Sequence, residues 1–269
     1  MIASLHYLQM GYDDQGNGMP IVFLHGFPHD RTLWAQQRVA LASRARCITP
    51  DLRGFGQSSA RAPYSMDQYS DDIVDLLDWL EIEQAVVCGL SMGGYVAMAM
   101  WRRHPERIRA LVLCDTRATA DTEQTRAARN ALIAVAQSVG VHAVAERHVV
   151  GMVGKTTRER RPEVVDMMTA MMARQGVAGV VGALEALRDR PDSRETLASI
   201  SVPVLVIVGD EDVLTPIDDA RAMMDLLPPA AQGRLERIVD AGHVTCVERP
   251  AAVTHALAEF LATLAINED

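Results

Sequence analysis

The sequence predicts an α/β protein whose core is a mostly parallel sheet with helices on both faces. Short, fully apolar segments typical of buried parallel strands alternate with longer helical segments near both ends of the chain. Several apolar segments lead directly into glycine and polar residues, which places polar groups where open α/β sheets bind ligands. Residues 117–199 break the alternation with helical patterns alone. We therefore expect a core of residues 1–116 and 200–269 and an inserted helical cap of residues 117–199.

The first part of the chain supplies most of the expected sheet. It begins with an opening antiparallel pair near residues 4–24, which precedes the alternating helices and strands. Helices are expected over residues 31–42 and 67–80, strands over 45–50 and 85–88, and a further strand over 108–114. The helix that follows the strand at 85–88 ends where His104-Pro105 interrupts it, because proline cannot continue a helix.

The second part of the chain contains the cap and the last strands. Helical patterns cover residues 122–139, 142–149, 157–175 and 177–188, and glycines separate them. The cap is expected to follow the sixth strand of the core. Apolar segments at 203–208 and 235–239 predict the remaining strands, and a final helix follows.

The segment Gly89-Leu90-Ser91-Met92-Gly93-Gly94 joins an apolar strand to a helix through one serine. A serine at such a sharp turn adopts a strained backbone, which requires neighbours without side chains two positions away. Gly89 and Gly93 meet that requirement. A G-x-S-x-G pattern by itself also fits an ordinary glycine-rich turn, but the flanking strand and helix favour a nucleophile elbow with Ser91 as the catalytic nucleophile.

A serine nucleophile requires a histidine base and an acid, which in this architecture follow in the order serine, acid, histidine. His243 lies in a loop after the last strand and is the candidate base. The pattern G-x-x-D-x-x-x-P favours Asp212 as the acid over Asp115, which closes the preceding strand. Asp210 and Glu211 are expected to bond loop backbone or face water. The histidines expected to be surface or structural residues are His6, His104, His142, His148 and His255.

The negative oxygen of a tetrahedral intermediate needs backbone N–H donors. The N–H of Met92 begins the elbow helix, and the N–H of Phe27 lies in the loop after an early strand. We expect these two groups to form the oxyanion hole. His25-Gly26 alone would fit an ordinary strand-to-loop turn, but the complete serine, acid and histidine order favours the catalytic interpretation.

Five motifs occur in a specific order along the chain. They are H-G-F-P at residues 25–28, D-L-R-G-F-G-Q-S at 51–58, G-L-S-M-G-G at 89–94, G-D-E-D-V-L-T-P at 209–216 and A-G-H at 241–243. In these motifs the chain resembles the α/β-hydrolase superfamily, and is most similar to its branch of small carboxylesterases, enol-lactonase-like enzymes and cofactor-free haloperoxidases, or perhydrolases. The resemblance implies an α/β-hydrolase fold with a mostly parallel eight-stranded sheet. H-G-F-P also occurs in haloalkane dehalogenases and epoxide hydrolases, but these have an aspartate nucleophile where this chain has Ser91.

Composition sets limits on partners and location. The chain has 269 residues and a formal net charge of −9, which gives no basic surface for nucleic acid or acidic lipid. No segment approaches the ~20 apolar residues of a membrane span, and the first residues lack a secretion signal. The four cysteines have no metal-ligand spacing, so reduced thiols in a cytoplasmic protein are expected. No motif implies a cofactor or a metal, and the oligomeric state is not indicated.

The sequence therefore predicts a serine hydrolase that cleaves small to medium carboxylic esters or lactones through an acyl-enzyme. Methionines of the cap are expected to line an adaptable apolar pocket over Ser91, although core packing explains any one of them equally well. These candidates are Met152, Met168, Met171 and Met172. Two alternatives stay open: a perhydrolase that uses peroxide at the same site, and a small-molecule receptor on a hydrolase scaffold.

Overall fold

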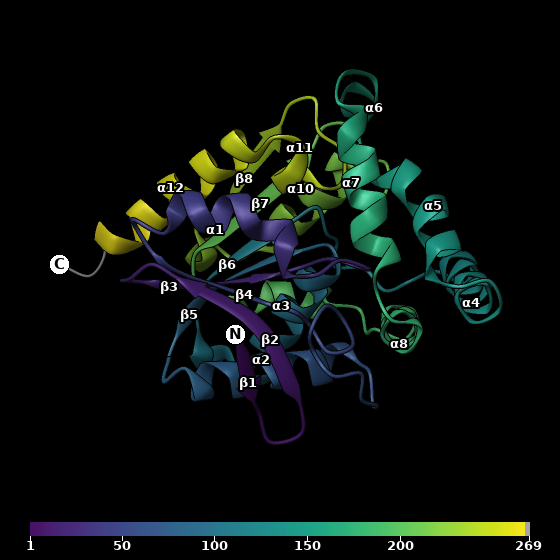
Figure 1. Ribbon diagram of the computed structural model, residues 1–269. Helices are drawn as coiled ribbons and strands as arrows, with labels where there is room; N and C mark the ends of the chain where they lie inside the picture. The colour runs from purple at the N-terminus through teal and green to yellow at the C-terminus, as the bar shows by residue number, and fades with distance from the viewer. Residues whose placement is uncertain (267–269) are drawn as a thin grey trace.

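A computed structural model describes residues 1–266 of the chain. The apolar segments form one eight-stranded sheet in the order β1-β2-β4-β3-β5-β6-β7-β8 (Figure 1). The strands are β1 (Ile2–Ser4), β2 (Gln9–Gln15), β3 (Pro20–Leu24), β4 (Arg46–Pro50), β5 (Ala85–Leu90), β6 (Ile108–Cys114), β7 (Val204–Gly209) and β8 (Arg234–Ile238). All neighbours from β4 to β8 pair in parallel, as the long apolar segments predict.

The opening strands differ in detail from the expected pair near residues 4–24. β2 pairs antiparallel with β1 on one side and with β4 on the other. β3 lies between β4 and β5 and is parallel to both. The antiparallel pair therefore lies earlier in the chain than expected, because β3 is apolar enough to be buried within the parallel sheet.

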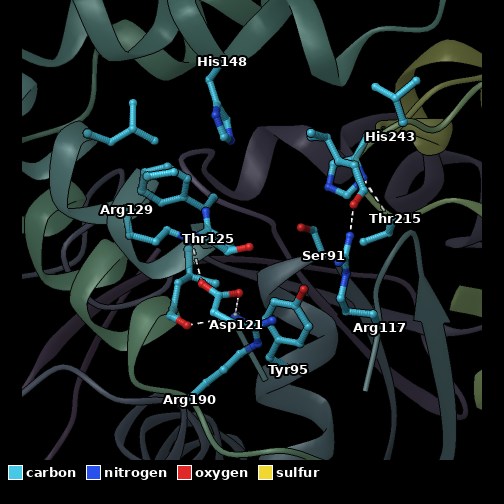
Figure 2. A pocket seen from close by; sticks show the side chains of 16 residues that line it. Ser91, Tyr95, Arg117, Asp121, Thr125, Arg129, His148, Arg190, Thr215 and His243 are labelled. Carbon is cyan, nitrogen blue, oxygen red and sulfur yellow. Dashed lines mark hydrogen bonds and ion pairs between the residues drawn. The ribbon is translucent and has the colours of Figure 1, made fainter. Parts of the chain in front are cut away.

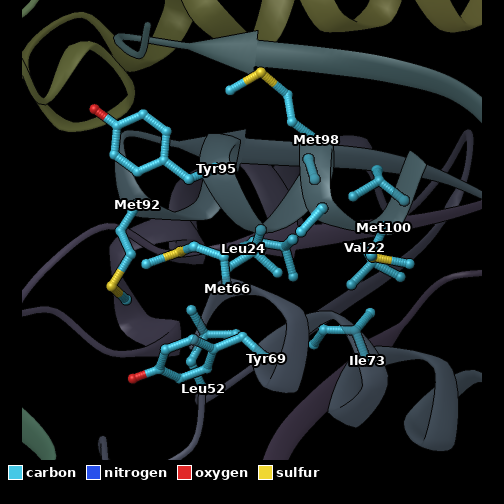
Figure 3. Packing of buried hydrophobic residues seen from close by; sticks show 14 of the residues in the cluster. Val22, Leu24, Leu52, Met66, Tyr69, Ile73, Met92, Tyr95, Met98 and Met100 are labelled. Atoms are coloured by element: carbon cyan, nitrogen blue, oxygen red, sulfur yellow. The ribbon is translucent and has the colours of Figure 1, made fainter. Parts of the chain in front are cut away.

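Helices cover both faces of the sheet. One face carries α2 (Met66–Trp79), α3 (Met92–Arg103) and α10 (Ile217–Leu226), and the other carries α1 (Ala35–Leu41), α11 (Thr245–Glu248) and α12 (Pro250–Ile266). Neighbouring residues of β3 alternate between these layers, since Val22 packs with α2 and α3 while Phe23 packs with α1. Figure 3 shows the first layer, where Met66 and Ile73 of α2 lie opposite Met98 of α3. Short 3₁₀ turns complete the core: η1 (Arg31–Trp34), η2 (Pro105–Arg107) and η3 (Pro229–Ala231).

Every regular element between β6 and β7 is a helix. Its helices are α4 (Glu123–Ser138), α5 (Val141–Met152), α6 (Lys155–Arg160), α7 (Pro162–Ala173), α8 (Val177–Arg188) and α9 (Arg194–Ala198). Helices α4 to α8 gather at one side of the sheet (Figure 1). The single helix expected over 157–175 is divided into α6 and α7 at Arg161-Pro162, because the residue before a proline disfavours helical backbone.

No helix within residues 1–266 is long and apolar enough to cross a membrane.

Candidate active site

Ser91 lies at a sharp turn between β5 and α3. Its φ of 53° and ψ of −110° are strained for a residue with a side chain. A Cβ on Gly89 would lie 2.2 Å from the Gly93 carbonyl oxygen, and one on Gly93 would lie 2.3 Å from the Leu24 carbonyl oxygen. Both positions therefore require glycine. The turn holds the Ser91 side chain at the carboxyl end of the sheet, next to a cavity.

His243 is joined directly to Asp212. Its Nδ1 lies 2.8 Å from Asp212 Oδ2, and both residues are buried. The hydroxyl of Thr215 donates to the same Oδ2 at 2.6 Å, and the backbone N–H groups of Leu214 and Thr215 donate to Oδ1. Burial acts to raise the pKa of Asp212, but His243 and these hydrogen bonds outweigh burial and lower it. An ionised Asp212 is therefore held against the imidazole.

Ser91 and His243 line the same cavity. Figure 2 shows the Ser91 side chain lying below the His243 ring, with Thr215 beside them. Within residues 1–266 the structure shows no hydrogen bond between the serine hydroxyl and the imidazole. Such contacts are often long in an enzyme without substrate and shorten when substrate binds.

Asp115, the alternative acid, has different partners. It is buried at the end of β6, where Oδ1 accepts from the Gly209 N–H at 2.9 Å and Oδ2 accepts from the Thr245 hydroxyl at 2.5 Å. These bonds tie β6 to β7 and to α11. Asp115 makes no hydrogen bond to His243, so the geometry favours Asp212 as the acid.

Burial, with the nearby charge of Asp212 next, raises the pKa of Asp115 well above its usual value. The unfolded chain has an aspartate pKa of about 3.9. Between that value and the raised one the folded protein binds the proton more tightly, so Asp115 stabilises the fold at low pH and less as pH rises. We expect Asp115→Asn to gain stability relative to the wild type as pH increases from about 4. Urea denaturation of both proteins at several pH values would measure this, and parallel curves would contradict it.

The expected oxyanion donors come from two different segments of the chain. Met92 is the first residue of α3, where an N–H has no partner within the helix. Phe27 lies in the loop after β3 and lines the cavity. Neither N–H donates to another group in the described part of the chain. His25 supports the Phe27 loop, because its Nε2 accepts from the Leu52 N–H at 2.9 Å and its protonated Nδ1 donates to the Gly26 carbonyl at 2.9 Å.

The loop that carries His243 is hydrogen-bonded to the segment that joins α5 and α6. The His243 N–H donates to the Met152 carbonyl at 2.8 Å. The buried Glu248 accepts from the Gly154 N–H and from the Gly242 N–H, each at 2.9 Å. A second carboxylate, Glu211, accepts from the Thr156 N–H at 2.8 Å. Glu211 was expected to bond loop backbone or to face water, but its carboxylate bonds the first turn of helix α6 and so joins this helix to the loop that carries Asp212.

The cavity beside Ser91 has a volume of about 370 Å³ and lies between the elbow, the Asp212 loop and helices α4, α5 and α8. Its wall is more polar than the sequence suggested. In Figure 2, Ser91, His243 and Arg117 lie on one side, and Asp121, Arg129 and Arg190 lie on the other. Arg117 donates to the Leu214 carbonyl and lies 3.3 Å from Asp219, so it supports the loop that carries Asp212.

The four methionines expected to line the pocket lie elsewhere. Met152, Met168, Met171 and Met172 are buried in the apolar cluster that also contains α1 and α12, and none of them borders the cavity. The expectation of a methionine-lined pocket is therefore corrected. These methionines of α5 and α7 pack into the core instead, which removes their apolar side chains from water.

His148 is also placed differently from the expectation. It was expected to be a surface or structural residue, but it lines the cavity together with Ser91 and His243. Figure 2 shows its ring pointing from α5 into the cavity. The ring contacts Phe27 edge-on, with 5.6 Å between the ring centroids. Burial lowers the pKa of His148 to about 3, with Arg129 and His243 adding to the effect. His148 is therefore an uncharged imidazole in the cavity wall.

Several functional candidates were missed by sequence reasoning. Thr215 contacts both Asp212 and His243, with its hydroxyl 3.2 Å from His243 Nδ1. Its position three residues after the candidate acid was a usable signal, because short side chains there accept or donate within such turns. Arg129 and His148 carried no such signal, because a helical pattern does not show which face meets a cavity.

The described residues contain no group of three or more His, Cys, Asp or Glu side chains placed to hold a metal ion. All four cysteines are buried as free thiols. Cys88 Sγ lies 4.0 Å from Cys114 Sγ, on neighbouring strands beneath the elbow. Burial raises the pKa of the Cys114 and Cys246 thiols, which keeps them protonated and unreactive.

Known proteins resemble this chain over nearly its full length. It is 30% identical over 256 residues to 3-oxoadipate enol-lactonase 2 of Acinetobacter baylyi, covering 95% of this chain and 92% of that protein. A thermophilic esterase from Thermogutta terrifontis superposes with a TM-score of 0.94 at 34% identity, covering 98% of both chains. The enol-lactonase from Burkholderia xenovorans LB400 superposes with a TM-score of 0.89 at 30% identity, covering 97% of this chain and all of that one.

The sequence pattern of one family spans most of the chain. The pattern described as the alpha/beta hydrolase fold matches residues 19–250, from the strand before the Phe27 loop to the start of the last helix. Strands β3 to β8, the elbow at Ser91 and the His243–Asp212 pair all fall within the matched range. This protein therefore belongs to the alpha/beta hydrolase fold family.

Proposed function

We propose that this protein is a serine hydrolase that cleaves small to medium carboxylic esters or lactones. The observation that carries the proposal is the strained Ser91 in one cavity with the buried His243–Asp212 pair. Ser91 attacks the carbonyl carbon while His243 accepts the serine proton. Asp212 orients the imidazole and stabilises the imidazolium that forms. His243 then gives the proton to the leaving alcohol, and an acyl-enzyme remains.

Water completes the reaction by the reverse proton path. His243 accepts a proton from the attacking water, and the collapse of the second tetrahedral intermediate returns it to Ser91. The N–H groups of Phe27 and Met92 would bind the negative oxygen in both steps. The names of the relatives, an esterase and two enol-lactonases, agree with this reaction class.

We also propose a division of labour within the chain. Residues 1–116 and 200–269 would carry the catalytic groups, and residues 117–199 would act as a cap that selects substrate. Support comes from the cavity wall, which includes residues of α4, α5 and α8 opposite Ser91. A volume of about 370 Å³ lies in the range of small-molecule sites. A cytoplasmic location stays a prediction from the sequence.

Labelling with a fluorophosphonate probe tests the nucleophile. We expect rapid labelling of the wild type at Ser91, located by peptide mass spectrometry, and none of Ser91→Ala. A parallel screen of p-nitrophenyl esters, simple lactones and peroxide-dependent halogenation would separate hydrolysis from perhydrolysis. A wild-type protein that binds small ligands but is never labelled would favour the receptor alternative and overturn the proposal.

A further inference from the structure

The cavity wall carries an excess of positive charge in a chain whose formal net charge is −9. Apart from histidines, its charged side chains are Arg117, Asp121, Arg129 and Arg190. Arg117 is already neutralised by Asp219, which lies behind the wall at 3.3 Å. Asp121 is then shared by two arginines, so these three groups leave a net charge of +1 at this end of the cavity.

Arg190 is fully engaged by the protein. Its guanidinium forms an ion pair with Asp121, donates to the Leu187 carbonyl at 2.8 Å and to the Thr119 carbonyl at 2.9 Å. It also stacks over the Tyr95 ring, 4.2 Å from the ring centroid. Only 3% of its side chain is exposed. Arg190 is therefore a structural support, and it holds Asp121 in place without Arg129.

Arg129 is engaged only through one nitrogen. Its Nε donates to Asp121 Oδ2 at 3.1 Å, and the side chain is 18% exposed. Within residues 1–266 neither terminal nitrogen donates to a protein group. These two nitrogens form the fork that binds a carboxylate with two parallel hydrogen bonds. Figure 2 shows Arg129 across the cavity from Ser91, on the same side as Asp121.

We propose that Arg129 binds a carboxylate of the substrate, so that the preferred substrates are esters or lactones that carry one anionic carboxylate. This inference rests on the proposed hydrolase function and names its substrate class. The net charge of +1 on Arg129, Arg190 and Asp121 matches one monoanionic group. The ionised Asp212 behind His243 repels an anion and favours its placement at the Arg129 end, which leaves the scissile carbonyl near Ser91.

Matched pairs of substrates test the inference. The acyl side is tested by p-nitrophenyl hydrogen glutarate against its neutral amide, p-nitrophenyl glutaramate. The alcohol side is tested by γ-acetoxybutyrate against γ-acetoxybutyramide, with release of acetate as the readout. For at least one pair, we expect the wild type to prefer the carboxylate by about 10- to 100-fold in kcat/KM, the range of a charge-assisted hydrogen bond.

Arg129→Gln should abolish this preference, because it keeps the stem but removes the charged fork. Asp121 keeps its ion pair with Arg190, so the variant is not left with an isolated buried carboxylate. Arg129→Lys should retain an intermediate preference as a point charge. The matched control is Arg126→Gln on the same helix, because Arg126 pairs with Asp189 outside the cavity and its side chain is 47% exposed. This control should leave both substrates of each pair unaffected.

The outcomes separate the two proposals. A wild type that is labelled by fluorophosphonate yet prefers neither carboxylate would overturn the Arg129 inference and leave the hydrolase function standing. Equal losses for both members of a pair in Arg129→Gln would assign Arg129 to cavity shape and also overturn it. If no ester is hydrolysed, calorimetric binding of glutaramate and of the neutral glutaramide to Ser91→Ala still decides, since equal affinities would contradict the inference.

Discussion

Replacement of Ser91 by alanine is expected to lower kcat for any hydrolysed ester by more than about 10⁴-fold, because the acyl-enzyme can no longer form. Replacement of His243 by alanine should cause a similar loss, since serine and histidine act as a unit. Steady-state hydrolysis of a p-nitrophenyl ester measures both effects. If a Ser91→Ala preparation free of contaminating esterase retained more than a few per cent of the wild-type activity, the mechanism would be wrong.

A folding control accompanies the Ser91 variants. Ser91 has a φ of 53°, which strains alanine by about 1 kcal/mol or more but is readily adopted by glycine. Ser91→Gly should therefore be as inactive as Ser91→Ala while melting at a temperature at least as high. Inactive variants that melt near the wild-type temperature would show that the loss is chemical.

Replacement of Asp212 by asparagine is expected to lower kcat by about 10³- to 10⁴-fold with little change in fold. The amide occupies the same volume and its oxygen can still accept from the Leu214 and Thr215 N–H groups. It cannot accept from His243 Nδ1 with the same charge, so it no longer stabilises the imidazolium or fixes its tautomer. Circular dichroism and the kcat of the variant would measure both parts of this prediction.

Asp115→Asn is the matched control for Asp212→Asn. Asp115 is a buried aspartate at a neighbouring strand end, but it bonds Gly209 and Thr245 rather than His243. We expect its replacement to reduce kcat far less. A larger loss in Asp115→Asn than in Asp212→Asn would assign the acid to β6 and overturn the present assignment.

The elbow and the order of its partners could be predicted from the sequence because their causes are local. Gly89 and Gly93 are needed within two residues of Ser91, and the structure shows the close contacts that exclude a side chain at both. The alternation of apolar and helical segments likewise predicts a parallel sheet, because strands buried on both faces contain few polar residues. The position of Asp212 before His243 agrees with the order serine, acid, histidine that the sequence analysis expects.

The pairing of the opening strands could be determined only from the whole sheet. β3 is short and apolar, and its sequence does not show which strands it pairs with. Its place between β4 and β5 is decided by burial on both faces, which a single segment does not reveal. The break between α6 and α7 is different, because Pro162 indicates it in the sequence itself. The helix expected over 157–175 did not take this proline into account.

The candidate catalytic residues could be predicted from the sequence, whereas the residues that line the cavity could not. Met171 of α7 and Arg129 of α4 both lie on helices between β6 and β7, yet the methionine is buried in the core and the arginine lines the cavity. Helical periodicity groups residues by face but does not say which face meets which neighbour. The face that meets the cavity depends on packing between helices far apart in the chain. That packing buries apolar side chains and keeps charged side chains near water.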